Sequence, residues 1–211
     1  MNRTGEKPYT PYSMERVERQ SLYLYLPNLL TYGRIVAVPA LVGCFFLEGD
    51  FGNWLALAIF VTAALTDVLD GYVARAWEQQ TSLGRMLDPI ADKLLVAAAL
   101  MMLAAQQTIA GWSLWAGVII LSREILVSGL REFLGEVNVS VPVSNLAKWK
   151  TVMQMAAIGF LLAGGAGDKI FPWTTLTGLC LLWASALVTL YTGWDYFRAG
   201  VKHVLELGHD E

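Results

Sequence analysis

The chain has 211 residues, of which 55% are hydrophobic and 16% are charged, and its formal net charge is −3. About a quarter of the residues in soluble domains are charged, so this composition excludes an ordinary soluble domain and indicates a membrane protein. The small net charge gives no basic surface for nucleic acid. The cysteines, Cys44 and Cys180, lie in apolar runs and predict small buried side chains rather than a disulfide framework.

Residues 1–25 form a polar segment in which the stretch 11–25 mixes Arg and Glu with Tyr and Leu. This pattern is typical of an interfacial or juxtamembrane segment, although a disordered tail fits residues 1–12 equally well. Six apolar segments follow, each close to the ~20 residues that cross a bilayer as a helix. They are approximately residues 28–47, 54–77, 84–105, 112–135, 146–163 and 173–197.

These segments predict an all-α integral membrane protein with six transmembrane helices in one domain, residues 26–200, followed by a short tail, residues 201–211. Lysine and arginine accumulate on the cytoplasmic side of membrane proteins. Of the 15 Lys and Arg residues, only Lys169 falls in the alternate connections 48–53, 106–111 and 164–172. The bias predicts that both termini, and with them the tail, face the cytoplasm.

Four aspartates interrupt the second and third apolar segments in the pattern D-x2-D-G-x2-A-R-x8-G-x3-D-x3-D. An ionisable side chain at membrane depth is costly unless it is paired, hydrated or bound to a metal. At about 100° per residue, the first two aspartates share one helix face and the last two share another. Two such faces opposed would form a pocket of carboxylates that suits one or two Mg²⁺ or Mn²⁺ ions. The eight fixed positions are Asp67, Asp70, Gly71, Ala74, Arg75, Gly84, Asp88 and Asp92.

A divalent-cation transporter is an alternative of another class, because acidic residues in membrane helices also line ion paths. It predicts acids spread through the depth of the membrane. The four aspartates cluster at one side, with an arginine and small residues beside them, which favours a catalytic pocket.

The complete pattern resembles the signature of the CDP-alcohol phosphatidyltransferases, six-helix membrane enzymes that generally work as homodimers. All eight positions match. The resemblance implies that Asp67, Asp70, Asp88 and Asp92 hold two divalent cations and that Asp92 is also the general base. It further implies that the cytidine diphosphate group of the donor, CDP-diacylglycerol, is contacted by Asn28, Thr31, Arg34, Gly71, Ala74, Arg75, Gly84 and either Thr81 or Ser82.

Four cations in the second half of the chain predict a second pocket beside the aspartates, one that binds an anion: Arg123, Arg131, Lys148 and Lys150. Such a pocket suits an acceptor that carries its own phosphate. The alternatives are contact with anionic lipid for the lysines and pairing with a nearby glutamate for Arg131.

Two segments, R-E-I-L-V-S-G-L-R-E-F and A-K-W-K-T-x2-Q-M, are similar to those of bacterial phosphatidylglycerophosphate synthases. This likeness implies glycerol 3-phosphate as the acceptor, phosphatidylglycerophosphate and CMP as products, and the bacterial inner membrane as the location. A sister enzyme that uses inositol phosphate, inositol, serine or phosphatidylglycerol remains the alternative.

Overall fold

The computed structural model describes the backbone of residues 26–76, 82–136 and 145–207, and over these residues it contains helices and connections but no strand. Each predicted apolar segment coincides with a helix, so the prediction of six helical segments is confirmed. The expected N-terminal interfacial segment lies outside the described residues. The helices are α2 (Leu26–Cys44), α3 (Asp50–Ala76), α4 (Ser82–Ala105), α5 (Ser113–Glu136), α6 (Asn145–Asp168) and α7 (Thr174–Leu207).

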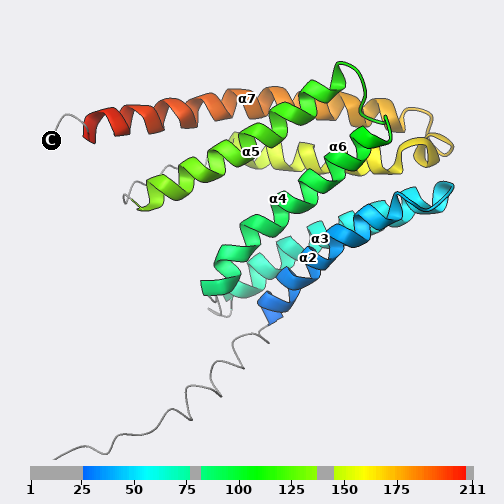
Figure 1. Cartoon of the computed structure of the whole chain (residues 1–211), viewed down its shortest axis with the longest axis horizontal. Helices are drawn as coiled ribbons and strands as arrows, with labels where there is room; N and C mark the ends of the chain where they lie inside the picture. The colour runs from blue at the N-terminus through cyan, green and yellow to red at the C-terminus, as the bar shows by residue number, and fades with distance from the viewer. Residues whose placement is uncertain (1–25, 77–81, 137–144, 208–211) are drawn as a thin grey trace, which may run out of the picture.

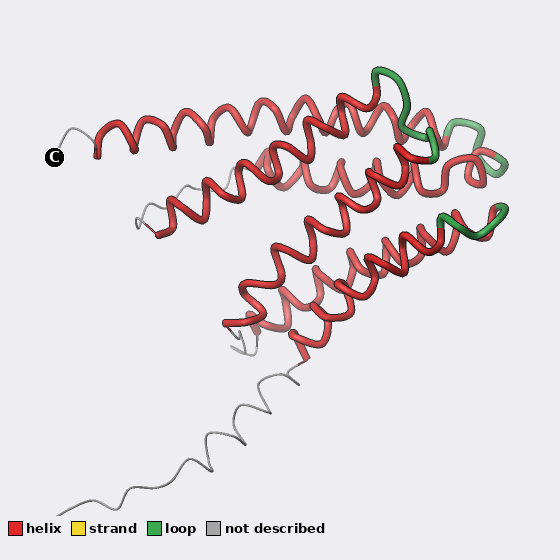
Figure 2. Tube along the Cα trace, in the orientation of Figure 1, coloured by secondary structure: helices red, strands yellow, loops and turns green. Residues whose placement is uncertain are grey.

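Successive helices run in opposite directions, and the described connections 45–49, 106–112 and 169–173 lie together at one end of the molecule (Figure 1). Figure 2 shows these three connections as the loops on the right, whereas the C-terminus lies at the left. The aspartate-bearing end of α3 and the start of α4 also lie at the left-hand end. The alternating direction agrees with the arrangement expected for consecutive membrane crossings.

The helices form two groups that diverge from the end with the short connections (Figure 1). In one group α2 packs against α3 and α4, and in the other α7 packs against α5 and most extensively against α6. Contact between α3 and α6 joins the groups, while α4 touches α5 and α6 only slightly. All six helices contribute to one buried apolar core, with Leu41, Phe60, Leu95, Ile120, Leu161 and Leu182 as members.

Large apolar side chains also cover the outside of the molecule. Val36, Met101 and Ile125 are each at least 66% exposed, which is typical of a surface that faces lipid. Within the described part of the chain, Ser113–Gly135 and Thr174–Trp194 are long and apolar enough to cross a membrane. The apolar helices thus agree with a membrane protein.

Two helices extend beyond their predicted ends. The fifth predicted segment ends at residue 163, whereas α6 continues to Asp168 with a kink at Gly164, where φ is 43°. Asn53 Nδ2 on α3 donates to the carbonyl oxygens of Leu162 at 3.1 Å and Ala163 at 3.4 Å, and so satisfies groups at the kink. Helix α7 continues to Leu207 rather than residue 197.

The two cysteines differ in environment. Cys44 is buried, as expected, but the expectation that Cys180 is buried is wrong, because its position on α7 is exposed. An apolar run in a membrane helix faces lipid as readily as protein, so hydropathy does not separate the two cases.

Gly178 fixes the close approach of α7 to α6. A Cβ atom there would lie 2.8 Å from Leu161 Cγ and 3.1 Å from the Leu161 backbone nitrogen. We expect Gly178→Ala to destabilise the protein by about 1–3 kcal/mol through overpacking, measured as a lower melting temperature in detergent. Gly117→Ala is the control, because its added methyl meets nothing within 4 Å. Equal melting temperatures for both variants would contradict this assignment.

Candidate active site

Arg34 on α2 lies where this helix meets the aspartate-bearing ends of α3 and α4. Its side chain is 1% exposed, whereas those of Asp67, Asp88 and Asp92 are 41%, 45% and 44% exposed. Arg34 Nη1 donates to Asp67 Oδ1 at 2.6 Å and also to Asp92 Oδ1, and Nη2 lies 3.4 Å from Asp88 Oδ1. One buried guanidinium therefore faces three carboxylates that remain open on their other side.

Thr31 adds a second link between α2 and α4. The residue is 1% exposed, and its hydroxyl donates to Asp88 Oδ1 at 2.5 Å. Thr31 and Arg34 are three residues apart and Asp88 and Asp92 are four apart, so each pair shares one helix face. Asp88 and Asp92 of α4 therefore face the same guanidinium as Asp67 of α3. The contacts of Thr31 and Arg34 with the donor, which the resemblance implies, remain predictions.

The other residues of the motif are located only by their helices. Helix α3 contains Asp70, Gly71, Ala74 and Arg75, and α4 contains Gly84. Only the backbone of these residues is described. The same holds for Asn28 at the start of α2 and Lys148 at the start of α6. Thr81 precedes α4 and is not described at all. Their expected roles remain predictions.

The donor set fits a hard cation in its chemistry. Asp67, Asp88 and Asp92 present only carboxylate oxygens, which Mg²⁺ and Mn²⁺ prefer. Among the described side chains, no group of three or more Asp, Glu, His or Cys residues is spaced to hold a metal ion, and Arg34 contacts all three carboxylates. A cation taking these oxygens would therefore replace contacts that Arg34 makes.

A cavity of about 460 Å³ opens beside the aspartates, between α3 and α4 on one side and α5 and α6 on the other. It exists because α4 packs only slightly against α5 and α6. Most of its lining is apolar, so the few polar side chains define its chemistry. They are Arg34, Asp67, Asp92, Lys93, Glu124, Thr151 and Gln154.

The cations predicted to bind the acceptor are only partly brought together. Lys150, 4% exposed, donates to Glu124 Oε1, and Glu124 lines the cavity. Arg123 Nη1 lies 3.7 Å from the same Glu124 Oε1. Arg123 also lines a separate groove between α5 and α7 and donates to Thr192 Oγ1 at 3.2 Å. Adjacent residues point about 100° apart on a helix, which explains why Glu124 faces the cavity while Arg123 lines the groove.

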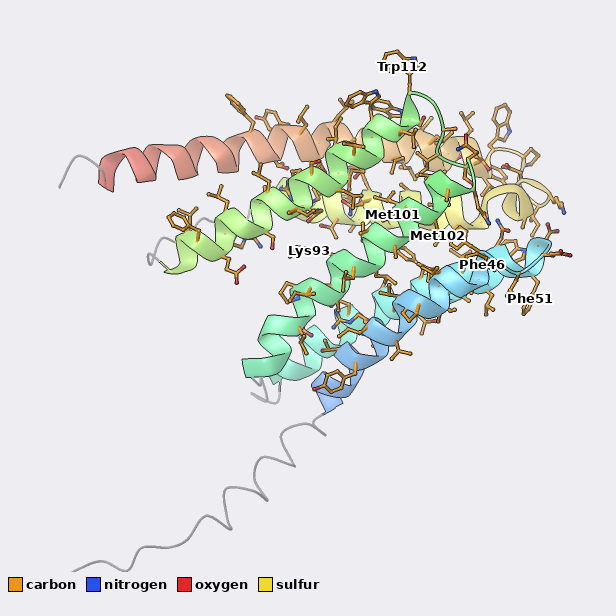
Figure 3. The ribbon with its side chains drawn as sticks, viewed as in Figure 1. Phe46, Phe51, Lys93, Met101, Met102 and Trp112 are labelled. Carbon is orange, nitrogen blue, oxygen red and sulfur yellow. The ribbon has the colours of Figure 1, made fainter. Side chains whose placement is uncertain are left out.

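Lys93 is a lining residue that the motif does not include. It follows Asp92 on α4 and is labelled in Figure 3. Its Nζ donates to Ser128 Oγ on α5 at 2.5 Å. The signal in the sequence is a lysine inside an otherwise apolar helix, where an uncompensated charge is costly. Its partner on α5 is a tertiary contact that the spacing of residues does not reveal.

The fold and the site define a helical protein with an aspartate-rich pocket at one end of a membrane-type bundle. Residues 24–191 match the CDP-alcohol phosphatidyltransferase family, which is more than half of the chain. The chain belongs to this family, whose members generally depend on divalent metal ions.

Curated relatives cover most of the chain. A protein of Rickettsia bellii named CDP-diacylglycerol--glycerol-3-phosphate 3-phosphatidyltransferase is 46% identical, over 84% of this chain and 96% of the relative. A protein of Cereibacter sphaeroides with the same name is 37% identical, over 85% and 96%. A rice protein named cardiolipin synthase (CMP-forming) is 40% identical, over 83% of this chain and 57% of the relative.

Arg34 compensates three carboxylates at once, so its removal leaves them to repel one another. We expect Arg34→Met to lower stability by about 1–3 kcal/mol, less than for a fully buried pair because the carboxylates are partly exposed. Because a cation would compensate the same carboxylates, Mg²⁺ should raise the melting temperature of the variant more than that of the wild type.

Thermal unfolding in detergent with and without Mg²⁺ measures both effects. Lys169→Met is the matched control, since Lys169 Nζ lies 2.6 Å from Asp50 Oδ2 in an exposed pair, which contributes at most about 1 kcal/mol. A melting temperature for Arg34→Met equal to that of the control would refute the role of Arg34.

Proposed function

We propose that this protein transfers the phosphatidyl group of CDP-diacylglycerol to glycerol 3-phosphate, forming phosphatidylglycerophosphate and CMP in phospholipid biosynthesis. The observation that carries the proposal is the convergence of Asp67, Asp88 and Asp92 on Arg34 beside a cavity. The proposal is supported by the names of the bacterial relatives, which match nearly their whole length.

The six helices are proposed to cross the bacterial inner membrane, with both termini and the aspartates on the cytoplasmic side. Support comes from the alternating helix directions (Figure 1) and from the scarcity of Lys and Arg at the opposite end. The shortest helix, α2, has 19 residues, so at 1.5 Å per residue it approaches the ~30 Å of a bilayer core. We further propose a homodimer, as the family resemblance implies.

The donor lies with its cytidine diphosphate group at the ends of α2, α3 and α4. Thr31 and Arg34 contribute a hydroxyl and a guanidinium that already face the aspartates. A guanidinium binds phosphate oxygens through two parallel hydrogen bonds. The remaining proposed donor residues are Asn28, Gly71, Ala74, Arg75, Thr81 and Gly84, of which the three small ones would let the nucleotide approach the backbone.

Two divalent cations, Mg²⁺ or Mn²⁺, are proposed to be held by Asp67, Asp70, Asp88 and Asp92. When bound, they would neutralise charge on the pyrophosphate and on the departing CMP. The partial exposure of Asp67, Asp88 and Asp92 supports this role, because it leaves carboxylate oxygens accessible.

Asp92 is proposed as the general base. It lines the cavity and would accept the proton of the acceptor hydroxyl, whose oxygen then attacks the lipid-side phosphorus. The bond from that phosphorus to the oxygen of CMP breaks, and no covalent enzyme intermediate is needed. The acceptor phosphate is assigned to Arg123, Arg131, Lys148 and Lys150 for their charge, and Arg123 and Lys150 both contact Glu124 Oε1.

An assay of the purified protein with labelled CDP-diacylglycerol and each acceptor tests the function. We expect CMP and phosphatidylglycerophosphate with glycerol 3-phosphate, and at most slow turnover with inositol phosphate, inositol, serine or phosphatidylglycerol. The phosphatidylglycerol arm is required because of the rice relative named as a cardiolipin synthase. Preference for another acceptor would reassign the enzyme within its family. Metal flux into liposomes without CMP release would instead indicate a transporter.

The base assignment is tested by Asp92→Asn. We expect CMP release to fall by at least about 100-fold, since general base catalysis contributes about 10²–10⁴, while binding of CDP-diacylglycerol stays measurable by equilibrium titration. Asp50→Asn is the control, because Asp50 contacts Lys169 at the opposite end of the bundle. Wild-type turnover in Asp92→Asn would eliminate this role.

A further inference from the structure

Gln154 carries a buried amide oxygen with no hydrogen-bond partner among the described residues. The residue lies on α6, is 3% exposed, and lines the cavity that also contains Asp92. Burying an amide oxygen without a hydrogen bond costs free energy that a Met of similar shape would avoid. The cavity therefore has a polar acceptor in its wall that the contacts within the protein do not explain.

The surroundings of Gln154 suit a small polar molecule. Lys150 precedes it by one turn on the same face of α6, and Thr151 and Lys93 line the same cavity. The volume of about 460 Å³ is ample for a three-carbon phosphate. Asp92 and Gln154 belong to helices on opposite sides of this space, so one molecule between α4 and α6 faces both.

We propose that Gln154 determines acceptor specificity by accepting a hydrogen bond, through Oε1, from the acceptor hydroxyl that does not react. This inference rests on the proposed function. Glycerol 3-phosphate has two hydroxyl groups: the terminal one loses its proton to Asp92 and attacks phosphorus, and the middle one keeps its proton. That middle hydroxyl is a donor that needs an acceptor inside a largely apolar cavity. Gln154 supplies that acceptor.

The geometry also explains why an amide serves here. The aspartates are proposed to be occupied with metal and with the reacting hydroxyl, and Glu124 is paired with Lys150. A neutral acceptor adds no further negative charge to a site that must admit a phosphate. Hydrogen-bonding sites discriminate strongly against substrates that lack the matching group, because the buried partner is then left unpaired.

The test compares glycerol 3-phosphate with 3-hydroxypropyl phosphate, which keeps the terminal hydroxyl and lacks the middle one. For the wild type, Gln154→Met and Gln154→Asn, each compound is assayed for CMP release, and the analogue also as a competitive inhibitor. We expect the wild type to prefer glycerol 3-phosphate on the order of 10- to 100-fold. If the analogue reacts, the preference is the ratio of the two kcat/KM values. If it only inhibits, the inhibition constant of the analogue is compared with the KM of glycerol 3-phosphate. In Gln154→Met this preference should fall to within about threefold, with a raised KM for glycerol 3-phosphate and little change in kcat.

Gln154→Asn withdraws the amide by one methylene while remaining polar, so it should also lose preference even if Gln154→Met folds poorly. Thr189→Val is the matched control: Thr189 Oγ1 on α7 is likewise buried without a partner among the described residues, but it does not line the cavity. It should retain the wild-type preference. Unchanged preference in both Gln154 variants, or an equal loss with both compounds, would overturn the inference. Absence of CMP release by the wild type with glycerol 3-phosphate would instead contradict the proposed function.

Discussion

The structure depends on how the charges of Arg34, Asp67, Asp88 and Asp92 are compensated inside an apolar bundle. A buried charge is tolerated only with a partner, and here one buried guanidinium on α2 faces carboxylates on α3 and α4. These contacts fix the ends of three helices relative to one another. They also hold the three carboxylates around one guanidinium while leaving each of them partly exposed.

The division of the helices into two groups has a chemical consequence. Because α4 touches α5 and α6 only slightly, a cavity remains between Asp67 and Asp92 on one side and helices α5 and α6 on the other. A transferase needs its two substrates to meet, one a lipid and the other soluble in water. In the proposed arrangement, the donor occupies the ends of α2, α3 and α4, and the acceptor lies between α4 and the helices α5 and α6. Positioning and electrostatics would then account for most of the catalysis.

The packing also assigns different roles to residues that are neighbours in sequence. Glu124 lines the cavity and pairs with Lys150, while Arg123 lines the groove against α7. Gly193 of α7 lies where an added Cβ would be 3.0 Å from Arg123 Cγ, so the absence of a side chain there leaves room for the arginine. The described cations of the second half of the chain therefore do not all line one pocket, because Arg123 lines the groove against α7.

The sequence by itself determined the six helical segments, the family and the aspartates of the site, because hydropathy and the spacing of eight residues are local properties. It also predicted that Asp88 and Asp92 share a face, since helical periodicity is fixed. Only the tertiary structure decided that Arg34 joins three of the aspartates and that Lys93 reaches Ser128. It also decided that Gln154, whose buried amide oxygen has no partner among the described residues, lines the cavity. The physical reason is that these contacts join separate helices, whose rotation and separation are set by packing across the whole bundle and not by any one segment.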